Sequence, residues 1–105
     1  MKHLPENLSD DIPASSGEHI LTLLRSGNVR IEHIVSNGQS NPDEFWYDQE
    51  QNEWVLLLNG TAVLQFEDGR IVDLKVGDYL LIPKNVKHRV EKASMDARWL
   101  VVHYV

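Results

Sequence analysis

From about residue 28 to its end, the chain alternates short runs suited to β-strands with tight-turn residues, a pattern that few folds accommodate. Over residues 29–35, apolar side chains occupy alternate positions, as in a strand with two different faces. Asn59-Gly60 and Asp68-Gly69 separate adjacent runs, and both pairs tolerate the positive φ of a hairpin turn. Strands are expected over residues 29–35, 44–49, 53–58, 61–66, 70–74, 79–82, 88–92 and 98–104. So many short, closely spaced strands predict an all-β sandwich or barrel.

The N-terminal part of the chain has a different pattern. Its first residues are polar and without periodicity, which predicts an extended arm. Ser15 and Glu18 have the spacing of a capping box, and aliphatic residues follow them. We therefore expect one short helix over about residues 16–25. The chain would then form one structural domain, with an arm and helix over residues 1–27 and a barrel over residues 28–105.

The expected strand from Glu53 to Leu58 is apolar on both faces. Val55 and Leu57 alternate with Trp54, Leu56 and Leu58, whereas a half-buried antiparallel strand normally alternates with polar residues. The second apolar face needs a cover, either from the N-terminal arm and helix or from a second subunit. We expect a homodimer that uses the side bearing Trp54, Leu56 and Leu58.

Composition excludes several classes of function. The chain has 105 residues, enough for one hydrophobic core. It contains no cysteine, so any metal would be held by nitrogen and oxygen ligands. A net charge of -6 argues against nucleic acid as a partner, since such binding depends on clustered cations. The N-terminus lacks the apolar core of a secretion signal and no apolar run could span a membrane, so we expect a cytoplasmic protein with no membrane partner.

Two half-motifs indicate where chemistry would occur. Glu53 is followed after six residues by Gly60, and Gly77 is followed by Pro83 and His88 at fixed spacing. This arrangement, over about residues 45–93, resembles the cupin family. The resemblance implies a double-stranded β-helix, which is a jelly-roll barrel with one open mouth. Asn85 stands where the family's second motif has a glycine, a replacement suited to a left-handed backbone conformation.

The first motif of the cupin family contains two histidines before the glutamate, and this sequence has neither of them. Those positions fall on Tyr47 and Gln49, or in a shifted alignment on Trp46 and Asp48. By resemblance, a divalent metal ion (Mn, Fe, Zn, Ni or Co) would be held by Gln49, Glu53 and His88. The alternative is that Glu53 and His88 pair with each other in a polar network without metal.

Several functions fit these residues. In a metal-dependent oxygenase or isomerase acting on a small polar metabolite, Glu53 and His88 would be catalytic. Tyr47 and His103 are expected at the pocket. A metal-free small-molecule sensor or binding barrel is the alternative, and a purely structural dimer is a third. Fold resemblance alone does not decide between them, or whether the chain is an enzyme.

Overall fold

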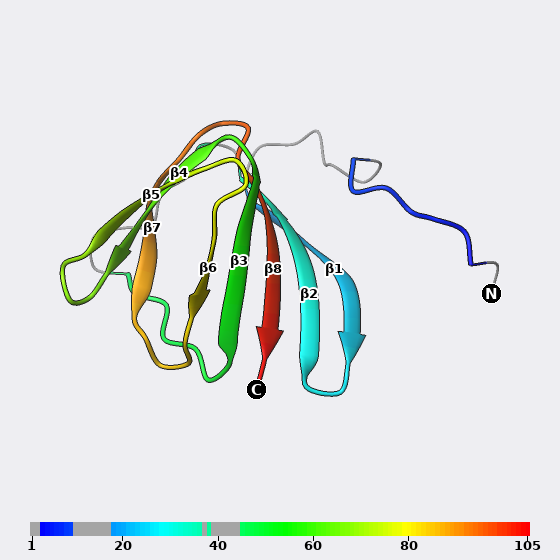
Figure 1. Cartoon of the computed structure of the whole chain (residues 1–105), viewed down its shortest axis with the longest axis horizontal. Coiled ribbons are helices and arrows are strands. Elements are labelled where there is room, and N and C mark those ends of the chain that lie inside the picture. Colours follow the sequence, from blue (N-terminus) through cyan, green and yellow to red (C-terminus); the bar gives the residue numbers. More distant parts are fainter. Residues whose placement is uncertain (1–2, 10–17, 37, 39–44) are drawn as a thin grey trace.

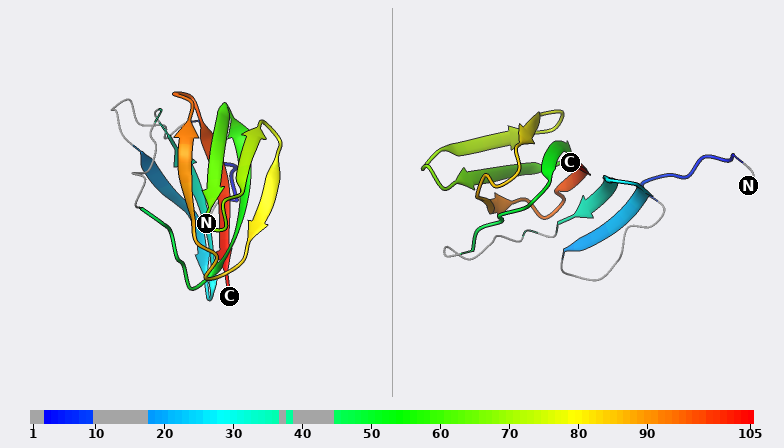
Figure 2. Two further views of the ribbon diagram at one scale, coloured as in Figure 1. Left: turned by 90° about the vertical axis from the view of Figure 1, so that its left-hand side faces the viewer. Right: turned by 90° about the horizontal axis from the view of Figure 1, so that it is seen from below.

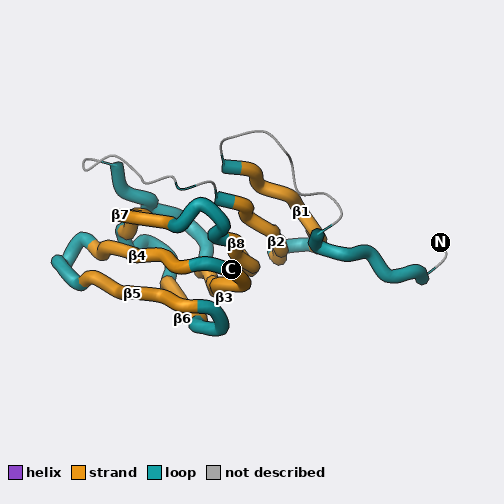
Figure 3. Tube along the Cα trace, turned by 90° about the horizontal axis from the view of Figure 1, so that it is seen from above, coloured by secondary structure: helices purple, strands orange, loops and turns teal. Residues whose placement is uncertain are grey.

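Eight strands form two antiparallel sheets in the computed structural model, which describes residues 3–9, 18–36, 38 and 45–105 (Figure 1). The larger sheet has the strand order β1-β2-β8-β3-β6 and the smaller one the order β5-β4-β7. The strands are β1 (His19–Ser26), β2 (Val29–Val35), β3 (Asn52–Asn59), β4 (Thr61–Phe66), β5 (Ile71–Lys75), β6 (Tyr79–Ile82), β7 (His88–Ala93) and β8 (Arg98–Tyr104). The two sheets face each other, as the turned views show (Figures 2 and 3).

The expected all-β jelly roll is confirmed. The predicted bounds of β2, β4, β6 and β8 agree with the structure, and those of β3, β5 and β7 differ by one residue at an end or at both. Gly60 and Gly69 have φ angles of 79° and 97°, as the predicted hairpin turns require. Asn85 has a φ of 63°, so it adopts the left-handed conformation expected of it.

The predicted N-terminal helix is wrong. From His19 onward its residues form the edge strand β1, which pairs with β2 from His19↔Val35 to Ser26↔Val29 across a turn at Gly27. A short aliphatic run is compatible with helix or strand. Here it forms a strand because its backbone makes hydrogen bonds with that of β2. The part of the capping box before Glu18 lies outside the described residues. The described segments contain no helix, and thus none with the length and apolar character needed to cross a membrane.

The strand expected over residues 44–49 is also wrong in its described part. Residues 45–50 make a single β-bridge, between Tyr47 and His88. The pairing does not continue, because the carbonyl of Gln49 accepts a hydrogen bond from Asn85 N in the turn before β7. This segment instead crosses one end of the space between the sheets.

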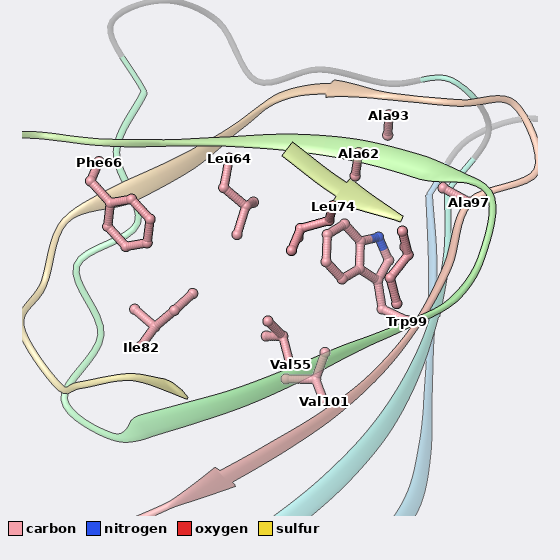
Figure 4. Close-up of a cluster of buried hydrophobic side chains, with 11 residues drawn as sticks. Val55, Ala62, Leu64, Phe66, Leu74, Ile82, Ala93, Ala97, Trp99 and Val101 are labelled. Carbon is pink, nitrogen blue, oxygen red and sulfur yellow. The ribbon is translucent and has the colours of Figure 1, made fainter. Parts of the chain in front are cut away.

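The hydrophobic core lies between the two sheets. Val55 on β3 and Val101 on β8 point from the larger sheet toward Leu64 and Phe66 on β4 (Figure 4). Trp99 closes the core at the end where Ala97 and Ala62 lie. Each of these side chains is at least 95% buried, so the inner faces of β3, β4 and β8 are fixed by packing.

The turn between β3 and β4 requires a glycine for two reasons. Gly60 has a positive φ, and a Cβ added to it would lie 2.9 Å from the Cα of Ala97. Gly27 also has a positive φ but has open space around it. We expect Gly60→Ala to lower the free energy of unfolding by about 3 kcal/mol and Gly27→Ala by about 1 kcal/mol. Urea unfolding of both variants measures this, and equal losses would show that the close approach at Gly60 does not matter.

Candidate functional site

A cavity of about 210 Å³ lies between the sheets beside the core. Its apolar walls come from both sheets, and its polar residues gather in two groups. The walls are Ile20, Ile34, Val55, Leu64, Ile82, Val90, Trp99 and Val101. The first polar group, called here the mouth group, is Tyr47, Gln49, Glu53 and His88; the second, the β2 group, is Arg30, Glu32 and His103, with Glu18 nearby.

His88 begins β7 and is 4% exposed. Its Nδ1 lies 2.9 Å from the carbonyl oxygen of Val86, and since a carbonyl can only accept, Nδ1 carries the proton. The neutral ring therefore presents the lone pair of Nε2. Burial lowers the pKa of His88, an effect that the bond to Val86 partly opposes. His88 is consequently a neutral imidazole at neutral pH, with its basic nitrogen directed at Glu53.

Glu53 lies at the start of β3, opposite Ile82 of β6 and His103 of β8. Its Oε2 is 3.9 Å from Nε2 of His88, too far for a hydrogen bond, and has no hydrogen-bond partner among the described residues. Burial raises the pKa of Glu53 to about 7; the charge of Glu32 adds to this effect and that of Arg30 opposes it. A carboxyl with this pKa exists in both protonation states near neutral pH.

Tyr47 and Gln49 reach the cavity from the segment before β3. The ring of Tyr47 stacks on that of His88 at 5.5 Å between centroids, and the backbones of the two residues exchange hydrogen bonds of 2.7 and 3.1 Å. Tyr47 thus holds the imidazole in place from one side. Trp46 does not line the cavity; its ring lies 5.9 Å from the guanidinium of Arg89.

The β2 group includes two residues that sequence reasoning missed, Arg30 and Glu32. Glu32 Oε1 accepts a hydrogen bond of 2.9 Å from His103 Nε2, and its Oε2 lies 3.0 Å from Arg30 Nε. Burial lowers the pKa of His103, although the bond to Glu32 acts in the opposite direction. The alternation of Arg30, Glu32 and Ile34 with the apolar positions of β2 was the available signal, since it places all three on one face.

The structure brings all five sequence-predicted residues to one cavity: Tyr47, Gln49, Glu53, His88 and His103. His33, which could also have pointed inward, lies on the other face of β2, where its Nε2 accepts a hydrogen bond from Arg98 at 3.1 Å. Among the described residues, no three His, Asp or Glu side chains are grouped as a metal centre would require. The groups of the mouth group that could bind a metal ion are the imidazole of His88, the carboxylate of Glu53 and the amide oxygen of Gln49.

Comparisons with known proteins agree with this architecture. Residues 30–103 match the family model of the cupin domain. The chain belongs to the cupin family. A solved structure from Ralstonia eutropha JMP134, provisionally named a mannose-6-phosphate isomerase, is 35% identical to this cupin, with a TM-score of 0.89 over 96% of this chain and 97% of the other. A search of curated proteins found no match.

Two solved structures of lower identity share the fold. A cupin superfamily protein from Desulfitobacterium hafniense DCB-2 is 22% identical, with a TM-score of 0.78 over 100% of this chain and 94% of the other. A protein of unknown function from Rhizobium leguminosarum is 20% identical, with a TM-score of 0.76 over 99% and 98%. Identities this low show the fold alone.

Proposed function

We propose that this cupin binds a small hydroxy-carbonyl compound in its cavity and moves a proton on it, as an isomerase does. The observation that carries the proposal is the pair of Glu53 and His88: a carboxyl with a pKa of about 7 faces a neutral imidazole nitrogen at 3.9 Å, in a cavity that the two sheets line. Buried groups with shifted pKa values that meet in a cavity are typical of acid–base catalysis.

The chemistry follows from the two protonation states. The lone pair of His88 Nε2 accepts the proton on the carbon next to the substrate carbonyl, while protonated Glu53 donates its proton to the carbonyl oxygen. The product of this step is an enediol. Protonated His88 then returns the proton to the former carbonyl carbon, while the Glu53 carboxylate takes the proton of the hydroxyl on the neighbouring carbon, which becomes the new carbonyl. Arg30 of the β2 group can donate hydrogen bonds to further substrate oxygens. A cavity of about 210 Å³ favours a compact metabolite, because pockets for larger ligands are about 300 Å³ or more.

The provisional name of the Ralstonia protein, a mannose-6-phosphate isomerase, supports the same class of reaction. An isomerase of that kind must move a proton between adjacent carbons. The resemblance covers nearly the whole of both chains, so the strands that line the cavity belong to the shared fold.

Solvent deuterium exchange tests the proposal. Glyceraldehyde, mannose and mannose 6-phosphate are incubated with the protein in D₂O, and the proton on the carbon next to the carbonyl is followed by NMR. We expect loss of that proton signal from at least one probe, above the rate without protein. No protein-dependent exchange with any of the three would contradict the proton-transfer function and leave a binding barrel as the better account.

A divalent metal ion at the mouth group is a second candidate, favoured by the unpartnered Oε2 of Glu53 beside the lone pair of His88. Gln49, Glu53 and His88 would hold the ion, which would polarise a substrate carbonyl. We expect bound Mn(II), Ni(II) or Zn(II) to raise the melting temperature and His88→Ala to abolish that rise. Gln49→Ala should weaken it less. Binding should be lost as pH falls, because protons compete for His88. Sub-stoichiometric metal by elemental analysis, with no thermal shift on adding any of the three, would exclude this candidate.

A further inference from the structure

The cavity holds more acidic than basic side chains. Among the described residues that line it, the acids are Glu18, Glu32 and Glu53, whereas Arg30 is the one lysine or arginine. The side chain of Arg30 is 28% exposed. A partly buried guanidinium with a free charge would be well suited to bind a phosphate or carboxylate group of a ligand. The kind of ligand therefore depends on whether the charge of Arg30 is free.

Arg30 already has an anionic partner inside the cavity. Its Nε lies 3.0 Å from Oε2 of Glu32, whose side chain is 11% exposed. The other oxygen of Glu32 accepts the hydrogen bond of 2.9 Å from His103 Nε2, which holds the carboxylate beside the guanidinium. Burial lowers the pKa of His103, so its ring adds no second positive charge near neutral pH. Arg30, Glu32 and His103 together are therefore electrically neutral.

The other described residues around the cavity add carboxyl groups and no cation. Glu18 is exposed at the rim, and Glu53 lies in the mouth group. Lys87 directly precedes His88, but it does not line the cavity, and its Nζ lies 3.5 Å from Oε2 of Glu67. The net charge of -6 on the whole chain also repels an approaching anion. A phosphate ester in this cavity would lie close to carboxylates, and such contacts between like charges are unfavourable.

An uncharged hydroxy compound suits the same groups. Each oxygen of the Glu32 carboxylate has a lone pair left for a further hydrogen bond. His103 Nδ1 is buried without a hydrogen-bond partner among the described residues, and it is an acceptor because the proton of the ring is on Nε2. Hydroxyl groups donate to such acceptors, whereas the oxygens of a phosphate dianion can only accept.

We infer that the cavity selects an uncharged hydroxy aldehyde or ketone over its phosphate ester, because Glu32 neutralises Arg30. The inference rests on the proposed function for the general class of substrate and narrows that class. It predicts that glyceraldehyde binds in preference to glyceraldehyde 3-phosphate, and mannose in preference to mannose 6-phosphate.

NMR titration of the isotope-labelled protein with each of these four compounds tests the inference, since it measures binding whether or not proton exchange occurs. We expect each uncharged compound to bind at least tenfold more tightly than its phosphate ester. Glu32→Gln has nearly the same size but leaves Arg30 unpaired, so it should raise the affinity for the phosphate esters at least tenfold. Glu67→Gln is the matched control, because it removes an exposed carboxylate whose partner is Lys87, and it should change no affinity. The amide spectrum of each variant shows whether it is folded.

Arg30→Gln provides a second test if Glu32→Gln does not fold. It removes the cation and leaves Glu32 unpaired, so the preference for the uncharged compounds should increase. Native protein that binds the phosphate esters as tightly as the uncharged compounds would overturn the inference, as would unchanged phosphate affinity in folded Glu32→Gln. Absence of binding by both uncharged compounds would also overturn it. Binding of the uncharged compounds without deuterium exchange would support the selectivity and contradict the proposed proton transfer.

Discussion

Glu53→Gln is expected to slow deuterium exchange on the responsive probe by two to four orders of magnitude, the usual contribution of a positioned acid–base group. The substitution preserves the size of the side chain but removes the group that titrates near pH 7. Exchange rates measured by NMR under identical conditions give the ratio directly. Probe binding, followed by the thermal shift that each compound causes, should change much less than the rate.

Two further variants test whether the slower exchange is specific to the Glu53–His88 pair. Glu67→Gln removes an exposed carboxylate whose partner is Lys87, and the rate should not change. His88→Asn keeps a donor for the carbonyl of Val86 but removes the lone pair at Nε2, and it should slow exchange as much as Glu53→Gln. Similar rates for Glu53→Gln and the native protein would show that exchange occurs without this carboxyl.

The same substitution should change the pH dependence of stability. Folded Glu53 has a pKa of about 7 and the unfolded residue about 4.5, so the folded chain binds more protons between these values. Stability is therefore lost as pH rises through this window, up to about 3 kcal/mol. Glu53→Gln abolishes that loss. We expect its melting temperature, relative to the native protein, to increase by about 10 °C between about pH 5 and about pH 8.

The pH-dependent difference in melting temperature between Glu53→Gln and the native protein reports on the ionisation of Glu53 and not on that of His88. The lowered pKa of His88 acts with the opposite sign, since it reduces stability as pH falls below the ordinary value, but it is present in both proteins and cancels to first order. The amide that Glu53→Gln introduces adds a cost that does not depend on pH. If the melting temperatures of Glu53→Gln and the native protein differ by the same amount at every pH, Glu53 has its ordinary pKa in the folded chain.

The half-motifs located the site because the fold fixes where their residues lie. Glu53 and His88 begin strands at the same end of the two sheets, and the bridge between Tyr47 and His88 carries Tyr47 and Gln49 to the cavity. Spacing along the chain was sufficient to predict these positions. Protonation states were not predictable, since they depend on burial and on the charges that other strands bring close.

The alternation along β2 places Arg30, Glu32 and Ile34 on one face, but the sequence does not say that this face lines the cavity. Arg30, Glu32 and Ile34 line the cavity, whereas Ile31, His33 and Val35 lie on the other face of the strand. The helix expected over residues 16–25 failed for a related reason: pairing with β2 is a contact that local pattern does not reveal.

The measurement that tests the central claim most directly is an NMR titration of both members of the pair. Carboxyl carbons of labelled glutamate and ring nitrogens of labelled histidine would be followed with pH, and Glu53→Gln and His88→Asn would assign the signals. We predict that Glu53 titrates near pH 7, while His88 stays neutral there, with its proton on Nδ1. A Glu53 that ionises near pH 4.5 beside a charged His88 would make the pair a structural ion pair and contradict the proposed proton transfer.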